Sequence, residues 1–126
     1  MKKLVAVFVC LLGITLVNGC CGAAAKRDEA RAKFCAANMR VMLGCIEMYN
    51  MDHSEMMKTP DFSMFQEGGL MMQSKLLKQP IQLPSDKCSY SFNGDFSSAD
   101  EGPGAGVISC TTHGTVEEID KKYLRR

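Results

Sequence analysis

The chain has 126 residues, which is enough for one domain, and its 15 basic and 14 acidic residues leave a formal net charge of +1. This balance provides no surplus of Lys and Arg to neutralise phosphates, so we expect no binding to nucleic acid. Seven cysteines and ten methionines are the unusual part of the composition, and they direct attention to sulfur chemistry.

The N-terminal segment, residues 1–25, has the order of a secretory leader. Two lysines precede an apolar run from Leu4 to Val17, and small residues follow it. Three fates fit, in this order of preference: acylation of Cys20 in a lipoprotein box, retention as a membrane anchor, and ordinary cleavage after Ala25. All three place residues 26–126 outside the cytoplasm.

From Asp28 to about Met56, apolar residues recur at spacings of three and four, which predicts one long amphipathic helix. Gly44 within this pattern indicates a close packing contact. The expected stripe consists of Phe34, Asn38, Val41, Met42, Cys45, Tyr49 and Asp52.

Four residues of this stripe are expected to serve packing and assembly: Asn38, Val41, Cys45 and Tyr49. For Asn38 we prefer an amide that caps loop backbone from the domain's own sheet. The alternative is a residue that sets the register between neighbouring helices of an assembly. Tyr49 is expected to be a core ring with its hydroxyl group at the edge.

Beyond the helix, Pro60 ends the pattern because the residue before a proline is pushed out of the helical conformation. Asp61 is expected to cap a short helix over residues 62–67. Alternating residues predict strands at 88–92 and 107–112, and a turn at His113-Gly114 leads into a third short strand.

These elements predict an α+β fold. A long N-terminal helix (26–57) is followed by a connector (58–87), a small antiparallel β region (88–118) and a basic, solvated tail (119–126). Because a sheet of two to four strands is not stable alone, it must pack on the second half of the helix.

The cysteines beyond the leader are Cys35, Cys45, Cys88 and Cys110. An oxidising compartment favours disulfides among them. Cys35 and Cys45 are ~15 Å apart along one helix and cannot bridge each other. We therefore expect a disulfide between Cys88 and Cys110.

A metal site is the alternative for the same residues. Cys88, Cys110 and His113 offer three zinc ligands, and a fourth would have to come from Cys35, Cys45 or His53 through folding. We prefer the disulfide.

The methionines allow a second metal hypothesis. Met48 and Met51 lie close to His53, and thioethers with an imidazole can bind Cu(I). The preferred interpretation is that methionines fill irregular gaps in a core or a partner interface. The sequence therefore predicts no cofactor.

Catalytic motifs are missing from the sequence. His53 and His113 are the only candidate bases of the usual kind, and neither lies in a nucleophile elbow, a metal-hydrolase motif or a CxxC redox motif. No Gly-rich loop with a following Lys-Ser/Thr is present to hold a phosphate. We expect a protein that is not an enzyme.

Two groups of residues together resemble a known family. The helix carries Cys35-Ala-Ala-Asn38 and then Tyr49, and the C-terminal part carries Cys88-Ser-Tyr and Cys110-Thr-Thr-His-Gly. This combination resembles type IV pilin-like proteins and pseudopilins, over most of residues 26–117. The resemblance implies a non-catalytic, membrane-anchored structural protein of a pilus- or type II secretion-like assembly. Its partners would be other pilin-like subunits or secretion-assembly proteins.

The leader differs from that family, because it lacks a Gly-Phe-Thr-Leu-x-Glu motif and has no acidic residue before Asp28. Two other functions therefore stay open. One is a free-standing surface or periplasmic lipoprotein binding module with a pilin-like fold, and the other is a periplasmic Met/His metal-binding protein. All three functions predict a location outside the cytoplasm, with the N-terminal segment as the link to a bacterial membrane.

Overall fold

The structure is a computed structural model that describes residues 18–97 and 102–125. The chain forms two compact units, residues 1–30 and residues 31–126. All the helices and strands belong to the second unit, except for the start of the long helix, which belongs to the first. Residues 4–17 of the predicted leader lie outside the described residues, as does the side chain of Cys20. Within the described part of the chain, no helix combines the length and apolar character needed to cross a membrane.

The first element is helix α2, Asn18–Asp52, which begins before the expected helical segment and ends four residues before Met56. Its buried side chains follow a repeat of three and four residues that favours one face of a helix. They are Ala32, Cys35, Ala36, Asn38, Met39, Met42, Cys45 and Ile46.

This buried face is rotated from the predicted stripe. Val41 is 46% exposed and Phe34 is 47% exposed, so the prediction that they face the core is wrong. Asp52 is also exposed. Ala32, Ala36 and Met39 lie on the buried face instead. Each residue turns the helix by about 100°, so residues next to each other in the sequence face different sides. The close contact expected at Gly44 is also absent, because a Cβ atom there would meet nothing within 4 Å.

The connector holds two short helical segments. The 3-10 helix η1, Phe62–Phe65, is capped by Asp61, whose carboxylate accepts a hydrogen bond from the Ser63 amide at 2.8 Å. This confirms the expected cap. Helix α3, Leu70–Gln73, follows after Gly68, which adopts a φ of 72° that L residues rarely reach.

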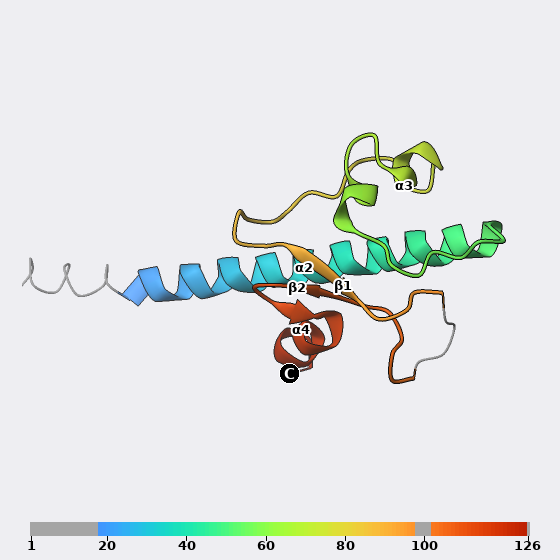
Figure 1. Cartoon of the computed structure of the whole chain (residues 1–126). Helices are drawn as coiled ribbons and strands as arrows, with labels where there is room; N and C mark the ends of the chain where they lie inside the picture. Colours follow the sequence, from blue (N-terminus) through green and yellow to red (C-terminus); the bar gives the residue numbers. More distant parts are fainter. Residues whose placement is uncertain (1–17, 98–101, 126) are drawn as a thin grey trace, which may run out of the picture. The chain divides into compact units, whose positions relative to one another are not determined.

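The sheet has three antiparallel strands in the order β1-β2-β3: β1 is Tyr90–Asn93, β2 is Val107–Cys110 and β3 is Gly114–Thr115. Tyr90 is paired with Cys110, and Cys110 with Gly114. The strands pass beside the second half of α2 (Figure 1). The predicted α+β class, a long helix with a small antiparallel sheet, is confirmed.

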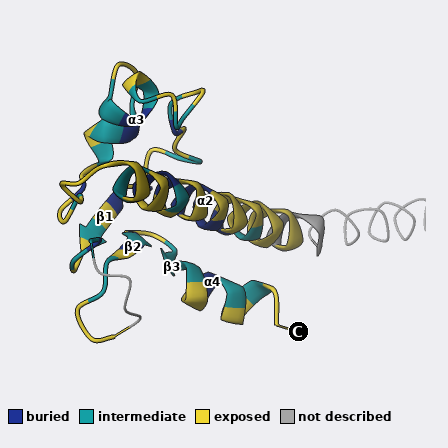
Figure 2. Ribbon diagram, turned by 90° about the vertical axis from the view of Figure 1, so that its right-hand side faces the viewer, coloured by how far each residue is buried: buried dark blue, intermediate teal, exposed yellow. Residues whose placement is uncertain are grey.

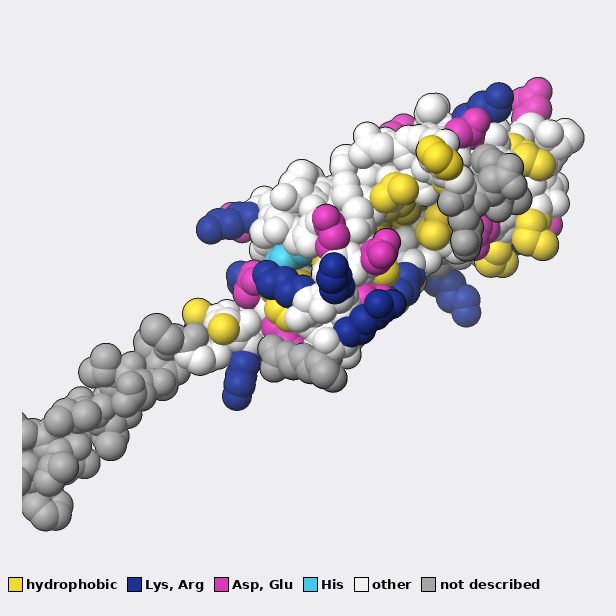
Figure 3. Space-filling view, turned by 90° about the horizontal axis from the view of Figure 1, so that it is seen from below, with side chains coloured by type: hydrophobic (Ala, Val, Ile, Leu, Met, Phe, Trp, Pro, Cys, Tyr) yellow, Lys and Arg dark blue, Asp and Glu magenta, His cyan; other side chains and the backbone are white. Residues whose placement is uncertain are grey.

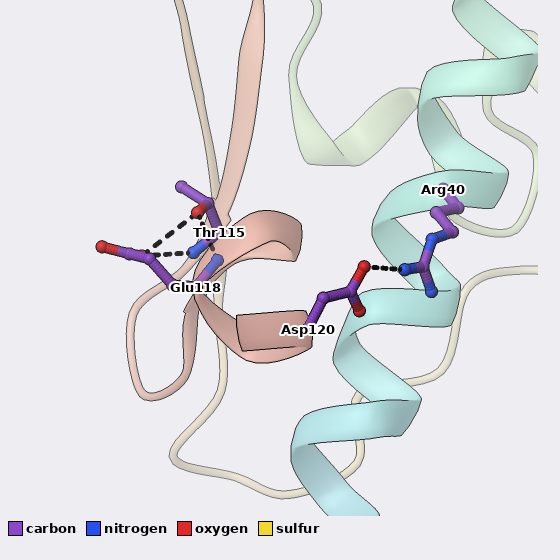
Figure 4. A network of polar contacts seen from close by, with 4 residues as sticks. All are labelled: Arg40, Thr115, Glu118 and Asp120. Atoms are coloured by element: carbon purple, nitrogen blue, oxygen red, sulfur yellow. Dashed lines mark hydrogen bonds and ion pairs between the residues drawn. The ribbon is translucent and has the colours of Figure 1, made fainter. Parts of the chain in front are cut away.

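The C-terminal residues differ from the expected solvated tail. They form helix α4, Val116–Tyr123, whose Ile119 is buried. Thr115 and Glu118 form a reciprocal capping box, and the Arg40 guanidinium of α2 donates to the Asp120 carboxylate at 2.6 Å (Figure 4). The capping box stabilises the N-terminus of α4, because it satisfies two backbone N–H groups that have no partner within the first turn of a helix.

The core lies between α2, the connector and the sheet, and buried residues follow the inner side of α2 (Figure 2). Phe62 of η1 is 5.4 Å from the Tyr90 ring, and Phe65 stacks on Phe92 at 5.7 Å between ring centroids. These contacts attach η1 to β1. The face seen in Figure 3 mixes acidic and basic side chains, with hydrophobic groups between them.

Candidate metal centre

Four side chains with metal-ligating atoms meet where the sheet packs on α2. Their ligand atoms all lie within 4.8 Å of one another, the three cysteines are buried, and the histidine is partly buried. One helix, one strand, one connecting segment and one turn contribute them. They are Cys35 of α2, Cys88 just before β1, Cys110 at the end of β2, and His113 in the turn between β2 and β3.

Four of the six separations between the ligand atoms are close to those of a tetrahedral site, and all six are within 4.8 Å. The Cys35 Sγ atom lies 3.8 Å from that of Cys88 and 3.4 Å from that of Cys110. The Nδ1 atom of His113 lies 3.7 Å from the Cys88 sulfur and 3.6 Å from the Cys110 sulfur. A zinc ion with ordinary bond lengths holds two sulfurs about 3.8 Å apart, and a sulfur and a nitrogen about 3.6 Å apart.

Strand alternation directs two of these ligands to the helix. Side chains of a strand point to opposite faces in turn, so Ile108 and Cys110 share the buried face of β2. Cys88 lies two residues before Tyr90 and is buried like it, as expected for extended chain in which every second side chain points to the same side. Cys35 enters from the opposite side because it lies on the buried face of α2.

The turn after β2 brings the histidine back to the cysteines. Gly114 has a φ of 84°, which a glycine adopts without steric cost. The Thr112 hydroxyl donates to the Lys87 carbonyl at 2.7 Å, and the Thr111 amide donates to the Ser89 carbonyl at 2.9 Å. These bonds join the end of β2 to the segment that carries Cys88.

The surroundings shift the pKa values of two thiols, Cys35 and Cys88, in opposite directions. Burial raises the pKa of the Cys35 thiol from 9.0 to about 12, although a hydrogen bond with Tyr90 opposes this shift. For Cys88, burial also raises the pKa, but hydrogen bonds with Ser85, Cys35 and Cys110 outweigh it and leave the pKa below 9.0. Without a cation, Cys35 therefore stays protonated at neutral pH, whereas a bound zinc ion deprotonates a coordinating thiol.

The predicted disulfide between Cys88 and Cys110 is not formed in the structure, where Cys35, Cys45, Cys88 and Cys110 are free thiols. A third sulfur, that of Cys35, lies within 3.8 Å of both of them. The sequence named Cys35 as one conditional fourth ligand and preferred the disulfide. The bridge remains a competing covalent state of the same atoms.

Two other candidate ligands lie elsewhere. Cys45 is buried on α2, but its sulfur lies 3.7 Å from the Leu76 carbonyl oxygen. His53 stacks on Tyr49 at 3.8 Å between ring centroids, and its Nδ1 atom lies 2.9 Å from the Tyr49 carbonyl oxygen. Neither joins the group of four.

The methionines named for copper are open to solvent: Met51 is 84% exposed and Met48 is 54% exposed. The His53 ring turns to Tyr49 instead.

Asn38 bonds to backbone, as expected, but that backbone belongs to the connector and not to the sheet. Its Nδ2 atom donates to the Gln82 carbonyl at 2.7 Å, so the amide caps connector backbone, and it also donates to the Tyr90 hydroxyl at 2.9 Å. Tyr49 lies partly buried against the core, as expected.

No protein-family model, curated protein or solved structure matches the chain.

Proposed function

We propose that this protein is a non-catalytic structural protein in which one zinc ion attaches the β region to the long helix. The observation that carries the proposal is the meeting of Cys35, Cys88, Cys110 and His113 with all ligand atoms within 4.8 Å. Four protein ligands complete the coordination of zinc and leave no open position for a water or a substrate. The ion's role is therefore structural.

Ligand type and spacing both favour zinc. Thiolates and an imidazole at tetrahedral positions suit Zn²⁺, while carboxylates and carbonyls suit harder ions. The separations of 3.4 to 3.8 Å between neighbouring ligand atoms leave room for a single ion between them. A three-stranded sheet with short strands needs outside support, and zinc binding contributes directly to folding free energy.

The test is metal analysis of the protein purified under reducing conditions. We expect one zinc per chain, and we expect Co²⁺ to produce the d–d and sulfur-to-metal bands of a tetrahedral thiolate site. Replacing Cys35, Cys88 or Cys110 by Ser, or His113 by Gln, should weaken zinc binding in competition with a chelator.

The chain offers two matched controls. Cys45→Ser removes another buried thiol from the same helix, and His53→Gln removes the other histidine; both should retain wild-type zinc affinity. Zinc binding that is lost equally in the controls would overturn the proposal. So would a Cys88–Cys110 bridge in protein isolated from its native source without reductant.

A second candidate function is a membrane-anchored subunit of a pilus- or secretion-like assembly, located outside the cytoplasm. The outer face of α2 favours it: Phe34, Val41 and Met48 recur every seven residues, and all three are exposed. A seven-residue repeat is the spacing at which side chains of two helices interlock. Gly44 lies between two of them, and the space around its Cβ position is open.

The occupant that we propose for this face is the same helix of another copy or of another pilin-like subunit. A photo-crosslinking residue at position 41, in cells of the source organism, should yield adducts with such subunits. The same residue at position 47, which is also exposed on α2, is the control. Equal crosslinking at 41 and 47, or none at either position, would contradict the second candidate.

A further inference from the structure

The buried hydroxyl group of Tyr90 lies between the helix and the sheet beside the metal centre. Tyr90 is 7% exposed and is paired with the ligand Cys110 across β1 and β2. Asn38 lies three residues after the ligand Cys35, on the same buried face of α2. The two side chains therefore join the same elements that the zinc ion would join.

The hydrogen bonds around Tyr90 have one consistent direction. A carbonyl oxygen can only accept, so the bond to Gln82 at 2.7 Å identifies the Asn38 group that faces it as the amide NH₂. The same NH₂ donates to the Tyr90 oxygen at 2.9 Å. The Tyr90 hydrogen is then left for another acceptor, and a side-chain hydrogen bond joins Tyr90 to Cys35.

We propose that Tyr90, oriented by Asn38, donates its hydroxyl hydrogen to the Cys35 sulfur and positions that sulfur as a metal ligand. This inference rests on the zinc site proposed above. Of the four ligands, Cys35 alone comes from α2, so its placement decides whether the helix takes part in the site.

Hydrogen bonds to ligand atoms are a common feature of metal sites in proteins. Ligands are held in orientation by hydrogen bonds from groups outside the coordination shell, and losing one typically weakens metal binding 10- to 100-fold. A tyrosine hydroxyl keeps its hydrogen at neutral pH, so Tyr90 can donate to a thiolate.

The test compares two hydroxyl deletions on one strand. Tyr90→Phe removes the proposed donor and retains the ring. Ser91→Ala is the matched control, because the Ser91 hydroxyl lies on the other face of β1, 2.8 Å from that of Ser109. Zinc affinity is measured by chelator competition, and the sulfur-to-metal band is measured in the Co²⁺ form.

We expect Tyr90→Phe to weaken zinc binding about 10- to 100-fold and to shift the sulfur-to-cobalt band, while Ser91→Ala changes neither. The band matters because a general loss of stability lowers affinity without altering the electron density on a bound sulfur. Asn38→Asp is a second variant that retains Tyr90. Its carboxylate accepts the tyrosine hydrogen, and the band should shift in the same direction.

The outcomes separate the two proposals. If the wild-type chain binds zinc and Tyr90→Phe and Asn38→Asp both retain its affinity and its cobalt band, the role of Tyr90 is wrong and the zinc site stands. If the wild-type chain binds no zinc, the proposed function itself fails. A shifted band in either variant with an unchanged Ser91→Ala control supports the inference.

Discussion

Cys35 and Cys110 are separated by 75 positions in the chain, yet their sulfur atoms lie 3.4 Å apart. One residue belongs to the long helix and the other ends the central strand of the sheet. The contact therefore joins the helix to the sheet. Any bond formed there, through a metal ion or between sulfurs, holds the sheet on the helix.

Removing zinc is expected to destabilise the protein. A ligand that binds only the folded chain stabilises it by about 2.7 kcal/mol when its free concentration is 100 times its Kd. Chelation should therefore lower the midpoint of urea unfolding in the wild-type protein and in Cys45→Ser. The chelator should have no effect on Cys35→Ser, and an equal effect there would contradict a site that includes Cys35.

The metal-free protein should lose stability at alkaline pH. Burial raises the pKa of Cys35 from 9.0 to about 12 in the folded chain, so the folded state holds this proton more tightly than the unfolded state. The resulting stability is fully present below pH 9 and is lost as pH rises from about 9 to 12. Unfolding midpoints of the metal-free wild type and of Cys35→Ala across this range measure the effect. The slope should be smaller in Cys35→Ala.

Met42 and Val41 are adjacent on α2 but lie on different sides of it, so we expect different losses of stability when each is replaced by Ala. Met42 is fully buried, and Met42→Ala should cost about 2–5 kcal/mol of unfolding free energy through lost contacts and a cavity. Val41 is 46% exposed, and Val41→Ala should change the unfolding free energy by about 0.5 kcal/mol or less. Denaturant unfolding of both variants checks this. Similar costs at the two positions would mean that the helix face is assigned wrongly.

The capping box at the start of α4 should contribute about 1 kcal/mol. Thr115 accepts a hydrogen bond from the Glu118 amide, and the Glu118 carboxylate accepts one from the Thr115 amide at 2.8 Å. Thr115→Ala should therefore lower the unfolding free energy by ~0.5–2 kcal/mol. Glu117→Gln, in the same first turn but outside the box, is the control and should have a smaller effect. A double-mutant cycle of Thr115 and Glu118 would show coupling only if the box is formed.

Local patterns predicted most of the elements of the fold. The three- and four-residue repeat predicted the long helix, because that repeat reflects helical geometry in any tertiary setting. Proline, Asp61 and strand alternation likewise placed the connector and two strands. Helix α4 was not predicted, because its basic residues were interpreted as a solvated tail. The sequence did contain a signal for it, since Thr115 and Glu118 have the spacing of a capping box.

The sequence by itself determined that Cys88, Cys110 and His113 lie at the ends of short strands and turns, within reach of each other. It could not choose between Cys35, Cys45 and His53 as the next neighbour. That choice depends on which face of α2 meets the sheet, and the apolar residues of α2 extend from the buried face onto Phe34 and Val41. Only tertiary packing, which places the small side chains of Ala32 and Ala36 in the core, turns Cys35 toward the sulfurs of the sheet.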